Sequence, residues 1–356
     1  MSDNSQKPRP EALEGREGQE AQEARQPADN AIRHLVQHED WTDDLMAAGE
    51  SLHTLGVPGG YALITRKKLS KLPYHYHRVT FGPVLDQYTD EGLKAALDAI
   101  VAFGKQDGAV YTDVHPMAFR TEQGAFVNAF AAQGFKEADH YVYKATVMVD
   151  LTQEEEAIFK AFKRSGQKSY RQSITRGITT AVVPINEENF EHFYALYQQT
   201  TDRSGYIIED KSWLKKQVLF WGGKGEMVLL FAYYEEKPVG ALLAYKNKGS
   251  LSTVYQGNNY DKDIMNRRPA NAMYWDLMKW AKAEGFEWFD FGGITYTEEM
   301  TNDKKGGIFN FKLQFGGQIL FLPGNYRKVL KAVPYKMIQA AMPVYSKIAL
   351  ARAKKS

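Results

Sequence analysis

Residues 227–258 constrain the fold of this chain most, because they form one nearly continuous block of β-type sequence. The stretch MVLLFAYYEEKPVGALLAYKNKGSLSTVYQGN contains three apolar runs, separated by turn-forming residues at 235–237 and 246–249. Runs of this kind joined by short turns are typical of antiparallel strands that pair in order. A helical pattern that begins near Pro269 comes next, and the strand pattern WFDFGGI follows at 288–294. This order predicts a mixed α/β unit rather than a doubly wound parallel sheet.

The first half of the chain repeats these kinds of element. Leu93, Leu97 and Ile100 have helical spacing, and strand patterns lie on either side of that helix. The alternating strand pattern HYVYKATVMVDL at 140–151 closes this half. With 356 residues, the chain is long enough for two domains of ~150 residues each. We therefore predict an α/β fold of the α+β type, approximately duplicated, with mixed sheets flanked by helices.

The composition excludes several classes of site. The chain has no cysteine, so disulfides, thiolate catalysis and cysteine-ligated zinc are excluded. Its 8 histidines form no HExxH pattern and no tight cluster in the sequence, and we expect neither a metal site nor a cofactor. No apolar run is long enough to span a membrane, and the N-terminus lacks the apolar region of a signal peptide. These observations predict a cytoplasmic protein.

Charge is distributed unevenly along the chain, although the net charge is only +2. Residues 1–30 contain seven acidic residues and no aromatic residue, and we predict a disordered acidic tail over 1–40. The segment 304–356 has eleven Lys and Arg and no acidic residue, and 157–186 is also free of acids. Two basic segments in a near-neutral protein favour a polyanionic partner or an anionic membrane. A solvated helix face explains each segment equally well when it is taken alone.

Motifs in a fixed order resemble the FemABX family of peptidoglycan bridge-forming enzymes. The motifs are TFGPVLD (80–86), KRSGQKSYRQSITRGITT (163–180), VYQGNN (254–259), FDFGGI (289–294) and FNFKLQFGG (309–317). The resemblance covers roughly residues 60–328. It implies two tandem acetyltransferase-like (GNAT) domains that transfer an amino acid from aminoacyl-tRNA to the stem-peptide amine of a peptidoglycan precursor.

The resemblance also implies domain boundaries. We expect a first acetyltransferase-like domain over 41–148, completed by 318–356, and a second over 149–317. We expect a basic amphipathic C-terminal end over 327–356.

Particular residues match positions that have roles in the family. Lys312 falls on the family's catalytic-site lysine, and Tyr255 falls on a tyrosine that lines the precursor site. In the segment DRSGYIIEDKSWLKKQ, relatives that use the nucleotide-linked precursor carry an arginine against its diphosphate, and this chain has Glu209. Lys211 and Trp213 follow closely, and the resemblance implies that both contact the precursor. The departure at Glu209 favours lipid II over the UDP-linked precursor.

The stretch FNFKLQFGG offers a chemical reason for Lys312. Its alternation predicts a short strand, with Lys312 on the face opposite the phenylalanines, and an outward surface lysine is the alternative. A lysine fixed in a dry cleft can stabilise the oxyanion that forms when an amine attacks an aminoacyl ester. We expect Gly316 and Gly317 to let the substrate backbone approach closely.

Two further strand ends carry candidate site residues. FDFGGI joins an apolar strand to Gly292 and Gly293, which we expect to bind substrate. Asp290 is expected to anchor the loop, and helping to place an ammonium group is the alternative. The strand VYTDVHP ends near the presumed interdomain cleft, where Asp113 or His115 could accept the proton of the nucleophile. We assign Asp113 as the catalytic base, and a turn-capping role explains it equally well.

The two basic segments have candidate partners. A tRNA acceptor arm is recognised largely by its backbone charge and shape. We expect its phosphates to contact Arg164, Lys168, Arg171 and Arg176. The C-terminal end mixes large apolar residues with eight Lys and Arg, which suits peripheral binding to the anionic inner face of the plasma membrane. A terminal helix packed on the first domain is the alternative for this end.

Two other functions stay open at this level. An acyl-CoA-dependent N-acyltransferase would share the fold, but it usually carries a QxxGxG/A turn, which we do not find in the sequence. A nucleic-acid- or lipid-binding module of the same fold, without catalysis, would tolerate the loss of Lys312.

Overall fold

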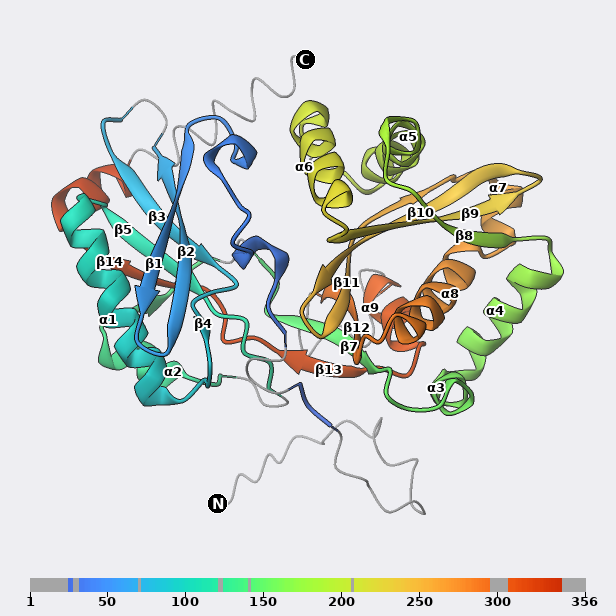
Figure 1. Cartoon of the computed structure of the whole chain (residues 1–356), viewed down its shortest axis with the longest axis horizontal. Coiled ribbons are helices and arrows are strands. Elements are labelled where there is room, and N and C mark those ends of the chain that lie inside the picture. The colour runs from blue at the N-terminus through green and yellow to red at the C-terminus, as the bar shows by residue number, and fades with distance from the viewer. Residues whose placement is uncertain are drawn as a thin grey trace, which may run out of the picture.

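The computed structural model describes residues 25–27, 32–69, 72–120, 124–139, 142–205, 208–294 and 307–340. These residues form two seven-stranded mixed sheets that stand side by side with helices around them (Figure 1). The predicted α/β fold with mixed, helix-flanked sheets is confirmed. Residues 1–24 and 28–31 of the expected tail, and residues 341–356 of the expected basic end, lie outside the described residues.

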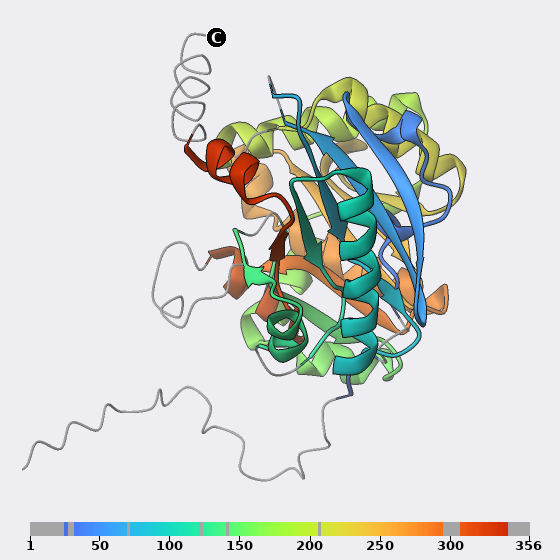
Figure 2. The same ribbon diagram turned by 90° about the vertical axis from the view of Figure 1, so that its left-hand side faces the viewer.

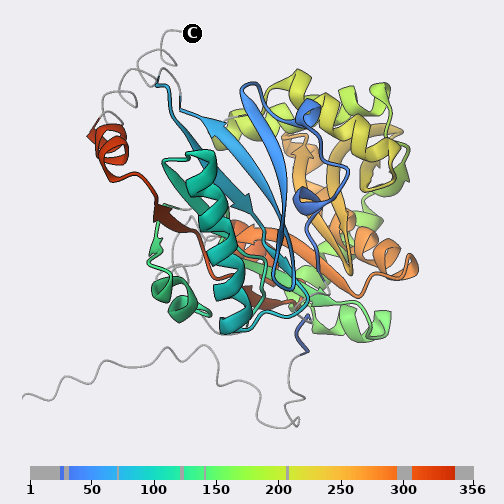
Figure 3. The same cartoon turned by 60° about the vertical axis from the view of Figure 1, so that its left-hand side comes forward.

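The first sheet has the strand order β1-β2-β3-β5-β14-β6, with β4 paired to β2. Strands β3 and β5 are parallel, and helix α1 (Asp90–Asp107) lies between them in the chain. Figures 2 and 3 show α1 lying across the outer face of this sheet, away from the second sheet. The remaining elements of this half are β1 (Glu50–Val57), β2 (Gly60–Lys68), β3 (His75–Thr80), β4 (Val84–Leu85), β5 (Tyr111–His115), α2 (Val127–Ala132), β6 (Lys136–Glu137) and β14 (Tyr326–Val329).

The second sheet has the order β13-β7-β12-β11-β10-β9-β8 and contains the expected antiparallel run β9-β10-β11. Strands β11 and β12 pair in parallel over Ser250–Ser252 and Trp288–Asp290, and helices α7 and α8 connect them. The two sheets thus share one plan, a parallel pair joined through a helix. The strands are β7 (Ala145–Asp150), β8 (Thr179–Val183), β9 (Met227–Tyr234), β10 (Lys237–Asn247), β11 (Ser250–Asn258), β12 (Trp288–Ile294) and β13 (Gln318–Phe321).

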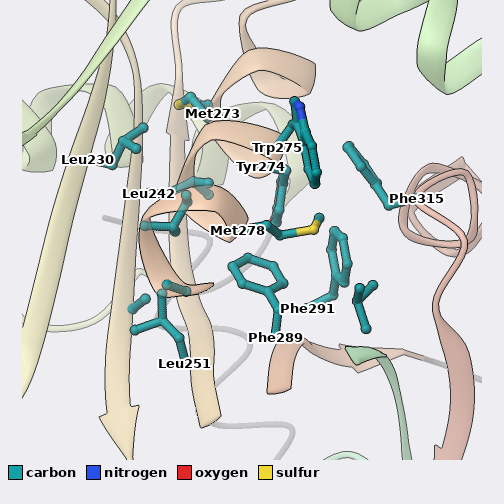
Figure 4. Close-up of a cluster of buried hydrophobic side chains, with 14 of the residues drawn as sticks. Leu230, Leu242, Leu251, Met273, Tyr274, Trp275, Met278, Phe289, Phe291 and Phe315 are labelled. Carbon is teal, nitrogen blue, oxygen red and sulfur yellow. The ribbon is translucent and has the colours of Figure 1, made fainter. Parts of the chain in front are cut away.

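Two apolar cores cover the two faces of the second sheet. One core contains residues of α3, α8 and α9, and Figure 4 shows its side chains from α8 packed against Phe289 and Phe291 of β12. The other contains residues of α5 and α6. The helices are α3 (Glu155–Ala161), α4 (Arg164–Thr175), α5 (Glu187–Ser204), α6 (Lys211–Gly223), α7 (Lys262–Asn266), α8 (Pro269–Ala283) and α9 (Gly307–Leu313).

Residues 32–40 correct the predicted extent of the tail. Ile32 and Leu35 are buried, and the N–H of Leu35 donates to Oδ1 of Asn247 in the second half at 2.8 Å. The side chain of Gln37 donates to the carbonyl oxygen of Thr80 in the first half at 2.7 Å. A prediction of disorder over 1–40 is therefore wrong for this stretch, because a few apolar and amide side chains suffice to fix it between the two sheets.

The C-terminal part returns from the second sheet to the first. Strand β13 pairs with β7 of the second sheet, whereas β14 pairs with β5 and β6 of the first. Residues 332–340 then form a helix, in which Ile338 packs against Val110 and Tyr111. Within the described ranges, no helix is both long enough and apolar enough to cross a membrane.

Candidate functional site

A bulge near the end of β12 shapes the candidate active site. The pairing of β12 with β7 shifts register between Asp290 and Gly293. Gly292 has φ +69°, and a Cβ atom there would lie 2.6 Å from the carbonyl oxygen of Thr253. Only glycine fits this position without displacing the neighbouring strand. The bulge leaves the carbonyl oxygens of Gly292 and Gly293 free to accept hydrogen bonds from a lysine of a later helix.

That lysine is Lys312, and it belongs to a helix. The prediction of a strand over 309–317 is wrong, because residues 307–313 are helical and Phe309 and Lys312 both lie on its buried side. Residues three apart share a face of a helix, whereas in a strand they point to opposite faces. The aromatic residues have the alternation of a strand, but this segment forms a helix because the helix places Phe309 in the core.

Lys312 is a buried cation with one spare donor. Its side chain is 8% exposed, and Nζ donates to the carbonyl oxygens of Gly292 at 2.9 Å and Gly293 at 2.8 Å. An ammonium group has three N–H donors, so one of them has no partner among the residues that the structure describes. A fixed charge with a free donor, shielded from water, is what the stabilisation of an oxyanion requires.

Aromatic side chains hold the helix that carries Lys312. Phe315 is fully buried, and its ring centroid lies 5.1 Å from those of both Phe162 and Phe291. Figure 4 shows Phe315, Phe291 and Tyr274 of α8 around one part of the core. Because these rings come from four separate segments, the position of α9 is fixed by tertiary packing.

Gly316 and Gly317 lie against neighbouring backbone of the protein. A Cβ atom on Gly316 would lie 2.5 Å from the carbonyl oxygen of Ala161. On Gly317 it would lie 2.7 Å from the carbonyl oxygen of Met148. These glycines admit neighbouring protein backbone, and they allow the chain to turn from α9 into β13.

Asp290 anchors the bulge, as expected. It is fully buried and accepts hydrogen bonds from the N–H of Gly292 at 2.9 Å, from the hydroxyl of Ser252 at 3.1 Å and from the hydroxyl of Thr146. Burial raises the pKa of Asp290, although these hydrogen bonds and the charge of Lys312 oppose the shift. The carboxyl group thereby fixes the glycine whose carbonyl oxygen receives Lys312.

Burial also changes the titration of Lys312. It lowers the pKa of Lys312 from 10.5 to about 8, and the charge of Asp290 opposes this shift. Between pH 8 and 10.5 the unfolded chain therefore binds more protons than the folded protein. Raising the pH across this window stabilises the folded state, because the buried lysine can lose its charge there.

This shift predicts a pH-dependent difference between the wild type and Lys312→Met. The free energy of unfolding of the wild type, relative to the variant, should rise by ~3 kcal/mol from pH 8 to 10.5, since one pKa unit is worth ~1.4 kcal/mol. Urea denaturation of both proteins at several pH values measures this difference. A difference that stays constant with pH would place Lys312 in solvent.

Asp113 is not placed to act as a base. It is fully buried on β5, and its two carboxylate oxygens accept from Nε of Arg327 at 2.6 Å and from Nη2 at 2.7 Å. Burial alone would lower the pKa of Arg327, but the hydrogen bonds and charge of Asp113 outweigh it and raise that pKa. The structure contradicts the catalytic assignment, because this carboxylate is occupied by a structural ion pair between β5 and β14. His115 is fully buried as well, beside the ring of Phe81.

Gly292 and Gly293 position the lysine. Their carbonyl oxygens hold Nζ of Lys312, and a Cβ atom on Gly293 would lie 2.3 Å from side-chain atoms of Tyr143. Protein atoms thus fill the space on the Cβ side of both glycines, and their predicted binding of substrate stays a prediction.

Two of the residues expected to bind the precursor share one apolar cluster. The rings of Tyr255 and Tyr197 lie 5.2 Å apart, and Trp213 packs in the same cluster from the first turn of α6. Burial raises the pKa of Tyr255. Lys211 is exposed at the rim, where its Nζ lies 2.6 Å from Glu191. Tyr255 and Trp213 thus pack against one cluster on the face of the sheet that α5 and α6 cover, and Lys211 lies at the start of α6.

The four basic residues predicted to contact tRNA separate into two pairs. Lys168 and Arg176 line a pocket of about 660 Å³ between α4 and the α7–α8 turn. Arg164 and Arg171 are exposed on the same helix but do not line it, and the guanidinium of Arg171 lies over the ring of Phe159. Lys312 does not line this pocket. The candidate catalytic lysine and the cationic pocket are therefore separate sites.

A group on the first sheet has the residue types of a metal site. Nε2 of His75 and Nε2 of His77 lie 2.7 Å and 2.8 Å from the same carboxylate oxygen of Asp107. Arg66 places a nitrogen 3.2 Å from Nδ1 of His75 and another 3.3 Å from Asp107. A metal on Nε2 would leave a proton on Nδ1 of His75, facing a guanidinium N–H, so the group fits a hydrogen-bonded network better than a metal site.

Sequence reasoning missed Arg267 and Arg268, which line the same pocket as Lys168 and Arg176. A signal was present, since two arginines stand directly before Pro269 at the start of a predicted helix. Thr146 and Ser252, the partners of Asp290, carried no signal, because their strands become neighbours only in the folded sheet.

Comparison with known proteins identifies relatives. A family model described as an acetyltransferase (GNAT) domain matches residues 161–308. The chain is 22% identical to the lipid II:glycine glycyltransferase of Staphylococcus saprophyticus, over 86% of this chain and 88% of that protein. It is 23% identical to the lipid II:glycine glycyltransferase of Staphylococcus haemolyticus, with the same coverage of both proteins.

Solved structures agree on the fold. The crystal structure of FemX superposes with a TM-score of 0.74 at 18% identity, covering 87% of this chain and 95% of that one. The structure of L-PGS from Bacillus licheniformis superposes with a TM-score of 0.51 at 15% identity, covering 82% of this chain and 88% of that one.

Proposed function

We propose that this chain, a member of the FemABX family and a homologue of the lipid II:glycine glycyltransferases, transfers a glycyl group from aminoacyl-tRNA to the stem-peptide amine of lipid II. The observation that carries the proposal is Lys312, a buried ammonium held by two backbone carbonyl oxygens with one donor to spare. It stands four residues after the end of the segment that matches the acetyltransferase domain model. The choice of a glycyl group and of lipid II as the acceptor follows the names of the relatives.

The reaction balances without any group beyond the two substrates. The amine nitrogen attacks the carbonyl carbon of the aminoacyl ester, a C–N bond forms, and the C–O bond to the ribose breaks. The amine loses one proton and the ribose oxygen gains one. Lys312 donates its spare N–H to the carbonyl oxygen as negative charge develops there, and a donor of this kind typically contributes ~10²–10³ in rate. With a pKa of about 8, Lys312 carries its proton at neutral pH.

The acceptor side is proposed at the aromatic cluster of Tyr255 and Trp213. Glu209 lies close enough for its charge to contribute to raising the pKa of Tyr255, after the larger effect of burial. A carboxylate at this place repels a diphosphate, so the cluster suits the stem peptide better than the phosphates of the precursor. This supports lipid II, whose diphosphate would remain at the membrane surface, over the nucleotide-linked precursor.

A surface for membrane contact is proposed on the helix at 332–340. Val333 and Met337 are 71% and 56% exposed, four residues apart on this helix, although both are apolar. Lys331 and Lys336 are exposed beside them, and Ile338 packs inward. Apolar side chains flanked by lysines fit the interface of an anionic bilayer. Ile338 packs against Val110 and Tyr111, so this helix has one side packed on the first half and one side exposed.

Removing the exposed apolar pair should weaken membrane binding. Val333→Ser with Met337→Ser is expected to lower binding to vesicles that contain phosphatidylglycerol by several-fold, because the inserted area is lost while the fold keeps Ile338. Sedimentation with vesicles measures this, and Val127→Ser, at another exposed apolar position, is the matched control. If the wild-type protein binds these vesicles no better than neutral ones, the proposed surface is wrong.

One assay tests the proposed function. The protein is incubated with glycyl-tRNA, or with a mixed charged-tRNA pool, and with either lipid II or the UDP-linked precursor, and the acceptor is analysed by mass spectrometry. We expect lipid II to gain one glycyl residue or more with the wild type, and Lys312→Met to transfer ~10²-fold more slowly. Transfer from glycyl-CoA or acetyl-CoA, without transfer from tRNA, would instead support an acyl-CoA-dependent enzyme. Binding of both substrates without any transfer would support a non-catalytic module.

A further inference from the structure

Asn247 is a buried amide at the end of β10, and the chemistry described so far does not use it. We propose that Asn247 is a positioning residue of the transfer reaction, which acts on Lys312 through the hydroxyl of Ser252 and the carboxylate of Asp290. The inference rests on the proposed function and specifies what holds its central lysine in place. A purely structural cap on the β10–β11 turn is the alternative role for this amide.

Three neighbouring strands bring these groups together. Asn247 ends β10, and Ser252 lies five residues further along the chain, on β11. Ser252 and Asp290 are direct partners where β11 pairs with β12, so their side chains are neighbours on one face of the sheet. Asn247, Ser252 and Asp290 are 2%, 3% and 0% exposed. Polar groups buried this deeply must find their hydrogen-bond partners within the protein.

The hydrogen bonds of Asn247 have a fixed direction. The backbone N–H of Leu35 donates to Oδ1 of Asn247 at 2.8 Å. A backbone N–H can only donate, so the oxygen of the amide must face Leu35, and its nitrogen must face the other way. Nδ2 of Asn247 accordingly donates to Oγ of Ser252 at 2.7 Å. The contact with Leu35 therefore decides how the amide acts on Ser252.

Ser252 carries this direction on to Asp290. Its oxygen accepts from Asn247, and its single hydrogen is donated to Oδ2 of Asp290 at 3.1 Å. A hydroxyl that accepts one hydrogen bond donates the next one more strongly, because each bond polarises its neighbour. Asn247 thereby strengthens a hydrogen bond that favours the ionised form of Asp290. The series Asn247–Ser252–Asp290 is called the relay below.

Asp290 transmits the effect to Lys312 in two ways. Its Oδ1 accepts from the N–H of Gly292 at 2.9 Å, and the carbonyl oxygen of Gly292 accepts from Nζ of Lys312 at 2.9 Å. The carboxylate therefore sets where the ammonium lies. Burial lowers the pKa of Lys312, and the negative charge of Asp290 opposes that shift. If Asp290 were displaced or protonated, Lys312 would be less well placed and would lose its proton at lower pH.

Within the described residues, one further titratable group faces this carboxylate. The hydroxyl of Tyr143, in the segment before β7, lies 3.5 Å from Oδ2 of Asp290, which is long for a hydrogen bond between oxygens. Burial raises the pKa of Tyr143 well above its usual value, so this hydroxyl stays protonated over the pH range in which Lys312 titrates. The titration of Lys312 therefore reports on Asp290 and on the groups that hold Asp290.

That titration tests the inference without any substrate. The full chain is labelled with ¹³C at Cε of lysine, and the NMR signal that is missing in Lys312→Met is followed against pH. In the wild type its midpoint should lie near pH 8. Asn247→Leu and Ser252→Ala should each move the midpoint to lower pH, because Asp290 is then held less firmly in its ionised form.

Ser250→Ala is the matched control. Ser250 is fully buried on the same strand as Ser252, and its hydroxyl has no hydrogen-bond partner in the part of the chain that the structure describes. The control should leave the titration midpoint of Lys312 unchanged. The double variant Asn247→Leu, Ser252→Ala should move the midpoint no further than Ser252→Ala alone, since Asn247 acts only through Ser252.

Single-turnover transfer shows the consequence for the reaction. In Asn247→Leu and Ser252→Ala, the rate at pH 8 should fall by ~3- to 10-fold, and its decline with rising pH should begin at lower pH. The lipid II concentration that gives half the maximal rate should stay within about two-fold of the wild type, because these buried side chains do not contact substrate. Rates are normalised to the folded fraction, since Asn247→Leu leaves the N–H of Leu35 without its acceptor.

The outcomes separate the two roles of Asn247. Loss of stability in Asn247→Leu with an unchanged titration of Lys312 would overturn the inference and leave Asn247 as a structural cap. A shift in Ser252→Ala alone, or additive shifts in the double variant, would also overturn it, because the effect would then not pass through the relay. If both single variants shift the titration but the wild type transfers no glycyl group to lipid II, the proposed function fails while the relay stands.

Discussion

Lys312→Met is expected to lower the turnover of glycyl transfer by ~10²-fold or more, while both substrates still bind within a few-fold of the wild type. Methionine keeps the apolar stem and removes the ammonium that meets the carbonyl oxygens of Gly292 and Gly293. Single-turnover transfer from glycyl-tRNA to lipid II measures the chemical step. The loss should appear in that step, because the spare donor of Lys312 is used only when the oxyanion forms.

Lys312→Arg serves as the charge-preserving comparison and should restore little activity. The guanidinium is planar and larger than an ammonium, so it cannot meet two adjacent carbonyl oxygens and the substrate from the same buried point. Wild-type turnover in Lys312→Met would refute the catalytic role. The variant loses two buried hydrogen bonds, which destabilises the fold, and a buried charge, which stabilises it. If Lys312→Met unfolds at neutral pH, the lysine has a structural role instead.

Asp113→Asn should lower the free energy of unfolding by roughly 3 kcal/mol and leave the turnover of the folded protein close to that of the wild type. The substitution removes the negative charge that two nitrogens of Arg327 contact, and a half-buried cation that loses its fully buried partner is costly. Urea denaturation gives the loss of stability, and transfer rates are normalised to the folded fraction.

The double variant Asp113→Asn, Arg327→Met controls for this explanation. It removes both charges, and it should recover part of the lost stability, because no unpaired ion is left beside Tyr111. A fall in turnover of 10²-fold or more in Asp113→Asn, without loss of stability, would contradict the structural role and support Asp113 as the catalytic base.

The sequence was informative wherever local patterns were sufficient. The antiparallel run at 227–258, the helix that starts at Pro269 and the strand with Gly292 were all predictable, because strand alternation, proline at a helix start and turn residues act over short distances. Lys312 was also predictable as the central residue, through the order of the motifs around it.

Other features depended on contacts between distant segments. The stretch FNFKLQFGG has an aromatic alternation typical of a strand, yet its first five residues belong to α9. Phe315, just after this helix, packs against Phe162 and Phe291 and fixes the helix in place. The partner of Asp113 could not be predicted, since Arg327 lies more than 200 residues away and reaches it only when β14 pairs with β5. In the same way, Ile32 and Leu35 looked like part of a tail until the two sheets provided a place for them.

The sequence by itself determined the kinds of element, their order and the residue types available for chemistry. The tertiary structure alone decided which of those residues meet. Lys168 and Arg176 form a pocket because Arg267 and Arg268 arrive from another segment, while Arg171 on the same helix points to Phe159. The physical reason is that hydrogen bonds and charges act over a few ångströms in space, and the chain separation between their partners carries no signal of that proximity.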